Sequence, residues 1–141
     1  MYQYNIKRKK GKEDNQVREK CADIRRKVKE TKCRPDIHDY PSVIVGCYTN
    51  YDRLYIDTTH SKPQYIQAPL LHKALSELGP IGSRKGLCDF IIGACAEPKA
   101  AFFAMTEEKC NLTQLQYTTA FRPRTGEKKK YCKNCKKVFS I

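Results

Sequence analysis

The stretch GACAEPKAAFFAM, residues 93–105, decides the fold that this sequence predicts. Pro98 suits the first turn of a helix, and the apolar run after it predicts a buried helix over residues 96–107. Cys95 then stands at the start of that helix, with Glu97 two residues further on. A thiolate and a carboxylate are therefore expected together at the beginning of a buried helix.

A second pair of thiols, Cys132 and Cys135, follows in the spacing Cys-x-x-Cys. We expect a helix over residues 132–139, and at a helix start both sulfurs can reach one ion. Zinc takes four tetrahedral ligands, and a catalytic zinc site leaves one position for water. Together with Cys95 the pair supplies three ligands, and Glu97 would accept a proton from the water. The zinc would lie between two helix N-termini, whose positive ends offset the charge of three thiolates.

Other interpretations of the cysteines stay open. Cys88 could join the three thiols in a closed structural zinc site. A redox dithiol is less favoured, because no thioredoxin-type βαβ pattern surrounds the Cys-x-x-Cys pair. The chain has 8 cysteines, but it shows no signal peptide and has ordinary apolar content. These features favour a reduced chain over a disulfide-stapled secreted scaffold.

The rest of the chain predicts one domain over residues 13–141, with its core in 42–141, after a basic disordered arm at 1–12. A thin apolar stripe at spacings of three and four predicts a helix over residues 14–32. Residues 42–49 and 53–58 predict a hairpin, because β-branched and aromatic residues flank turn residues. The remaining expected elements are a helix at 69–78, a mobile glycine-containing loop at 79–86, a strand at 112–121 and a basic turn at 122–130.

The net charge of +13 makes nucleic acid the first candidate partner, because neutralised phosphates release counterions. No apolar run approaches the ~20 residues that span a bilayer, so no membrane partner is expected. Basic residues dominate residues 1–35 and residues 122–137, and the second cluster flanks the cysteine pair. The candidate contacts to a phosphate backbone are Arg122, Arg124, Lys128, Lys129 and Lys130.

The stretch GACAEPKAAFFAM followed by YCKNCKKVF resembles the cytidine deaminase-like superfamily. Within it, the pattern resembles the deaminase domains of bacterial polymorphic toxins, especially the YwqJ-like group, over roughly residues 42–141. The resemblance implies an α/β fold, an αβα sandwich around a small mixed sheet that begins with a hairpin. It also implies that Cys95, Cys132 and Cys135 hold one catalytic zinc ion and that Glu97 transfers protons. Tyr131 stands where proline is common, so the loop entering the last helix is expected to differ.

The same resemblance implies a zinc-dependent hydrolytic deaminase that converts cytosine to uracil in a polynucleotide, with DNA favoured over RNA. Adenine remains an alternative target base, and RNA, free nucleosides and free nucleotides remain alternative substrates. A non-catalytic, zinc-stabilised nucleic-acid-binding module is a further alternative. The candidate substrate contacts are Tyr48, Asn50, Ala96 and Tyr131.

The biological setting follows from the resemblance alone. It implies a secreted or injected effector that acts in the cytoplasm of a target cell. It also implies an immunity protein as a partner. We expect the chain itself to be monomeric.

Overall fold

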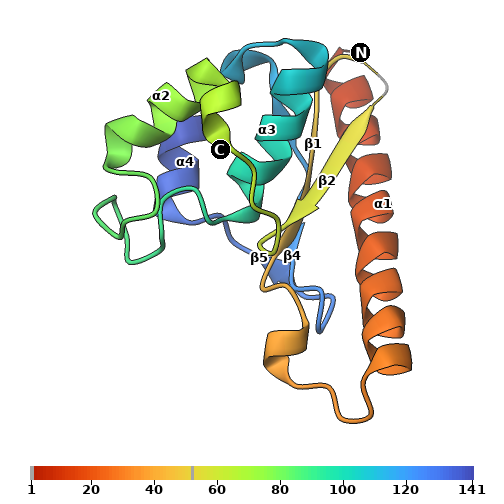
Figure 1. Cartoon of the computed structure of the whole chain (residues 1–141). Helices are drawn as coiled ribbons and strands as arrows, with labels where there is room; N and C mark the ends of the chain where they lie inside the picture. The colour runs from red at the N-terminus through yellow and green to blue at the C-terminus, as the bar shows by residue number, and fades with distance from the viewer. Residues whose placement is uncertain (1, 52) are drawn as a thin grey trace.

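The computed structural model describes residues 2–51 and 53–141, and its elements form three layers around a central sheet (Figure 1). Helix α1 (Tyr2–Thr31) runs along one face of the sheet. Helices α2 (Pro69–Leu78), α3 (Ala96–Glu108) and α4 (Lys133–Phe139) lie on the other face. The α/β class predicted from the sequence is therefore confirmed. No helix in the described ranges is long and apolar enough to cross a membrane.

The sheet is small and is built around β1 (Ile44–Tyr48). This strand pairs with β2 (Leu54–Thr58), β3 (Gln116–Tyr117) and β4 (Ala120–Phe121), and β5 (Lys128–Lys129) pairs with β4. The strand order is β2-β1-β4-β5, with β3 beside β1. Every pair among the described strands is antiparallel, so the prediction of a mixed sheet is wrong. The short turn between β4 and β5 could not carry the crossover that a parallel pair requires.

Strand β1 is buried on both faces, which explains its continuous apolar character. Ile44 packs with residues of α1, while Val45 and Cys47 pack into the cluster that contains α3. Gly46 faces α1 at close range. A Cβ atom placed on Gly46 would lie 3.1 Å from Val17 Cγ2 of α1, and it would also lie 2.7 Å from Leu54 Cδ1 and 2.9 Å from Thr118 Cγ2. The glycine therefore lets the helix approach the sheet closely.

Helix α1 begins at Tyr2 rather than at residue 14, so the prediction of a disordered arm over residues 1–12 is corrected from Tyr2 onward. Once the helix is anchored through Val17 and Cys21, each further residue adds a hydrogen bond at little extra cost. Polar contacts fix α1 against the sheet. The Asp14 carboxylate accepts hydrogen bonds from the Thr119 N–H at 2.7 Å and from the Thr119 hydroxyl at 2.9 Å.

The stretch predicted as one strand at residues 112–121 is divided. It begins as a 3-10 turn, Leu112–Gln114, whose N-cap residue Asn111 and third residue Gln114 form a reciprocal capping box. Two short strands, β3 and β4, follow it. The Thr118 hydroxyl accepts a hydrogen bond from the Gly46 N–H at 2.8 Å, so a side chain replaces one rung of the ladder. The predicted hairpin and the predicted helices at 69–78, 96–107 and 132–139 are confirmed to within a few residues.

Candidate metal centre and active-site pocket

The three thiols predicted to bind metal come together. Cys95 is the N-cap residue of α3 and Cys132 is the N-cap residue of α4. The Sγ atoms of Cys95, Cys132 and Cys135 all lie within 4.8 Å of one another, and the first two are 3.4 Å apart. Three sulfurs at ~2.3 Å from a tetrahedral zinc would be about 3.8 Å apart. The group is therefore compact enough to hold such an ion.

The protonation of these thiols also suits a soft cation. Hydrogen bonds from the thiols of Cys135 and Cys95, supported by backbone N–H groups, lower the pKa of Cys132. One of those backbone donors is the Cys135 N–H, which lies 3.5 Å from Cys132 Sγ. The same shared hydrogen bonds raise the pKa of Cys95 and of Cys135. The thiolate form is thus favoured at Cys132, and a metal ion can replace the protons of the other two thiols.

Glu97 lies directly beside the thiols. Its side chain is only 3% exposed, and the Cys135 thiol donates to Glu97 Oε2 at 3.5 Å. Burial raises the pKa of Glu97, while the positive charge of Lys129 acts in the opposite direction. A buried carboxyl group with a raised pKa is suited to accept and return a proton. The predicted pairing of Glu97 with the thiols is therefore present.

A cavity of about 300 Å³ opens onto this group. Its volume is that of a site for one small ligand. Three basic side chains and one aromatic ring contribute to its wall. The lining residues are Ser42, Val43, Thr59, Arg84, Phe90, Ile91, Ala94, Cys95, Glu97, Lys129, Lys130 and Cys132. The cavity thus combines a metal-binding edge with a positively charged edge.

Of the basic residues predicted to contact phosphate, Lys129 and Lys130 line the cavity. Arg122, Arg124 and Lys128 are exposed and do not line it. Arg122 and Arg124 belong to the turn between β4 and β5, which α1 touches, because Arg25 Nη1 donates to the Pro123 carbonyl oxygen at 3.0 Å. The basic segment therefore extends from the cavity toward α1.

Two of the expected substrate contacts lie at the end of β1 that is opposite the cavity. The cavity is lined by Ser42 and Val43, which precede β1. Tyr48 is the last residue of β1 and is 1% exposed, and Asn50 lies beyond it in the exposed hairpin turn. Helices α3 and α4 start at the opposite end of the strand from this turn. Neither residue lines the cavity, so the structure does not bring Tyr48 or Asn50 to the thiols and Glu97.

The other two expected substrate contacts are used for packing. Ala96 is completely buried in the core that joins α3 to the sheet. The Tyr131 hydroxyl donates to the backbone carbonyl of Thr118, and its ring lines a neighbouring depression with Lys136. Neither side chain lines the cavity beside Glu97. Substrate contacts at Ala96 and Tyr131 are therefore not supported by their positions.

The sequence did not point to Asn134, the third residue of Cys-x-x-Cys. This side chain is 4% exposed. Its Oδ1 accepts from the Leu87 N–H at 2.8 Å, and its Nδ2 donates to the Phe90 carbonyl oxygen at 3.4 Å. Asn134 thus ties the loop before α3 to the start of α4. The sequence feature that could have identified Asn134 is its position between the two cysteines of the pair.

Arg84 and Phe90 reach the cavity from the loop that connects α2 to α3. This loop carries no periodic pattern, so its side-chain directions could not be read from the sequence. Cys88 lies in the same loop, but within the described residues it does not join the three-thiol group. The closed four-thiolate site is therefore not formed. All 8 cysteines are free thiols, as expected for a reduced chain.

Comparisons with protein-family models, with curated proteins and with solved structures give no match to this chain. The geometry of the cavity and of its side chains is therefore the basis for a functional assignment.

Proposed function

We propose that this chain is a zinc-dependent hydrolytic deaminase that converts cytosine to uracil in a polynucleotide, with DNA favoured over RNA. One observation carries the proposal: Glu97 is buried, contacts one of three clustered thiols and lines the same cavity as two of them. Cys95, Cys132 and Cys135 would hold the zinc ion. The bound metal would supply the acidity that activates a water molecule.

Glu97 would carry the protons of this reaction. The oxygen of water forms a bond to C4 of cytosine, and the bond from C4 to the amino nitrogen breaks. The two protons of the water pass through the Glu97 carboxylate, one to N3 of the ring and one to the departing nitrogen, which leaves as ammonia. Burial in the first turn of α3 keeps the Glu97 carboxyl group beside the thiols, where the water must react.

The charge of the cavity favours a polynucleotide over a free nucleoside. Arg84, Lys129 and Lys130 line it, and the whole chain carries a net charge of +13. A neutral nucleoside needs no such surface, whereas a phosphate backbone is attracted by it. The choice of cytosine, the preference for DNA and the role as a bacterial toxin or effector domain follow from the resemblance of the two cysteine motifs to toxin deaminases. That resemblance also supports the finer assignment of the fold as deaminase-like.

The test is direct conversion of substrate. Zinc-loaded protein is incubated with single-stranded DNA, duplex DNA, RNA and free cytidine, and the products are sequenced or separated for uracil. The Glu97→Gln variant is the control, because it keeps the three thiols and removes the proton acceptor. It is expected to retain zinc and to lose about 10²-fold to 10⁴-fold in rate. Absence of conversion by fully loaded wild-type protein would leave the non-catalytic binding module as the better description.

A further inference from the structure

Phe90 is an apolar ring placed where a ligand would enter. Its side chain lines the cavity beside Glu97, yet the residue is 51% exposed. The ammonium group of Lys129 lies 5.7 Å from the centroid of the Phe90 ring. A single exposed aromatic residue is ordinary on a protein surface, but one with a cation over its ring at the edge of a reactive cavity is not explained by packing.

The segment that carries Phe90 is held in place by hydrogen bonds. Asn134 binds this backbone at two points, because it accepts from the Leu87 N–H and donates to the Phe90 carbonyl oxygen. Arg84 Nη1 donates to the Asp89 carbonyl oxygen at 2.6 Å. A Cβ atom placed on Gly86 would lie 2.5 Å from Asn134 Oδ1, so the loop is packed closely against α4. Little freedom of this backbone remains to be lost when a ligand binds.

We propose that Phe90 and Lys129 form a nucleotide-binding subsite, in which the ring stacks on a base next to the target base and the ammonium group binds its phosphate. The proposal rests on the proposed function. An aromatic face is the usual platform for an unpaired base, whatever its sequence. Because the cavity of about 300 Å³ suits one small ligand, the base on the half-exposed ring is a neighbour of the one beside Glu97. The subsite would make the site selective for strands over free nucleosides.

Fluorescence can report the stacking directly, because the chain contains 0 tryptophans. Phe90→Trp places the protein's one tryptophan at the subsite. The Glu97→Gln background blocks turnover during the titration. Titration with a single-stranded oligodeoxynucleotide is expected to quench this emission in a saturable way. An oligonucleotide with abasic positions on both sides of the target cytosine should bind with much weaker quenching.

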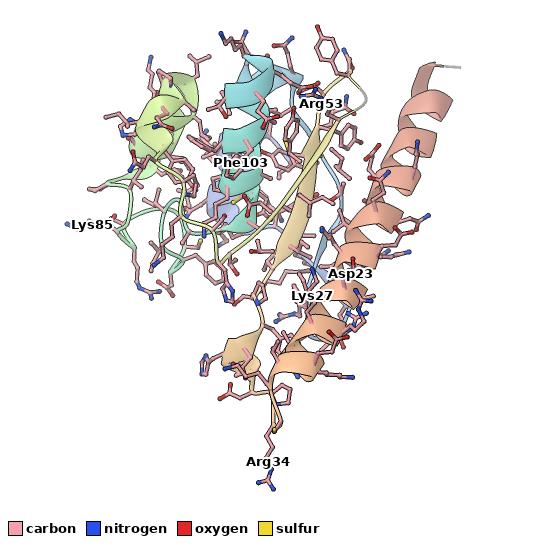
Figure 2. The ribbon with its side chains drawn as sticks, turned by 45° about the vertical axis from the view of Figure 1, so that its right-hand side comes forward. Asp23, Lys27, Arg34, Arg53, Lys85 and Phe103 are labelled. Atoms are coloured by element: carbon pink, nitrogen blue, oxygen red, sulfur yellow. The ribbon has the colours of Figure 1, made fainter. Side chains whose placement is uncertain are left out.

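Phe103→Trp in the same background is the matched control. Phe103 is also partly exposed, at 39%, but it lies on α3 and does not line the cavity (Figure 2). Its emission is expected to stay unchanged during the same titration. Equal quenching at both positions, or none at Phe90→Trp while the oligonucleotide binds, would overturn the subsite.

Kinetic measurements show whether the Phe90 ring contacts a neighbouring base or the target base. Phe90→Ala is expected to raise KM for an oligonucleotide about tenfold and to lower kcat/KM for free deoxycytidine by a much smaller factor, and Phe90→Tyr should restore the wild-type KM. An equal loss on free deoxycytidine would overturn the proposal, because the ring would then serve the target base or the pocket itself. Selective quenching at Phe90→Trp in a protein whose wild type converts no base would overturn the proposed deaminase and keep the subsite.

Discussion

At the scale of single residues, Gly46 shows how the fold depends on one missing side chain. We predict that Gly46→Ala lowers the free energy of unfolding by about 1–3 kcal/mol, because the new methyl group must displace Leu54 and Thr118. Urea denaturation measures the change. Gly11→Ala is the control, since nothing lies within 4 Å of the added atom and alanine favours a helix. A neutral effect at Gly46 would mean that Leu54, Thr118 and Val17 of α1 pack less closely around this position than described.

The residues at the site differ in how far chemistry alone identifies them. The grouping of Cys95, Cys132 and Cys135 beside Glu97 could be predicted, because a metal site demands particular atoms at particular spacings. Tyr48 and Asn50 could not be judged in this way. Their role depends on which end of the sheet the helices begin at, and this is a property of the tertiary fold. Phe90 is placed by a loop without periodicity, so no sequence pattern gives its direction.

At the scale of elements, local pattern predicted most helices and the first hairpin but not the later strands. Helix α3 has an uninterrupted apolar run that is buried as expected, except at Phe103. Residues 112–121 have strand-like composition throughout. Side-chain acceptors nonetheless compete with the ladder and divide the segment, because Gln114 accepts from the Asn111 N–H and Thr118 accepts from the Gly46 N–H. Strand β5 consists of two lysines, Lys128 and Lys129, and exists because β4 offers it a partner.

The convergence of α3 and α4 predicts how metal binding responds to substitution. Cys132→Ser is expected to abolish stoichiometric zinc binding, because it removes the sulfur that both other thiols contact. Metal analysis after desalting measures the ratio, with about one zinc per chain expected for the wild type. Cys88→Ser is the matched control and should keep its zinc, since Cys88 lies outside the group. Loss of zinc in both variants would point to the closed four-thiolate site instead.

Removal of the metal should also loosen the junction of the two helices. For an ion at one hundred times its dissociation constant, binding adds about 2.7 kcal/mol to the free energy of unfolding. A chelator is therefore expected to lower the melting temperature of the wild type and to leave that of Cys132→Ser unchanged. An equal shift in both proteins would show that the chelator acts elsewhere.

At the scale of the whole molecule, buried tyrosines set an alkaline limit to stability. Burial raises the pKa of Tyr48 to about 12, and it raises the pKa of Tyr65, Tyr117 and Tyr131 as well. The unfolded chain loses these protons near pH ~10, so the folded state binds more protons above that pH. Stability is then complete below pH ~10 and falls as the pH rises toward the folded-state values. Urea unfolding at increasing pH measures the fall.

Tyr48→Phe provides the control for this alkaline effect. It removes one titrating group from the buried set, so the loss of stability per pH unit above pH ~10 should be smaller than in the wild type. The thiol of Cys47, whose pKa is also raised by burial, acts in the same direction and remains in the variant. Stability that stays constant up to pH ~12 would contradict the burial of these hydroxyl groups.

The net charge of +13 gives the whole molecule a predicted salt dependence of polynucleotide binding. Each lysine that neutralises a phosphate of single-stranded DNA contributes about 0.7 to the slope of log affinity against log salt. Lys130 lines the cavity, so Lys130→Ala should reduce that slope by about this amount.

Lys73→Ala is the matched control, because Lys73 is an exposed lysine on α2 outside the cavity. Fluorescence anisotropy with the Glu97→Gln protein measures both variants without turnover. If both lysines change the slope equally, the charge acts as a diffuse field and the strand follows no defined path across the cavity.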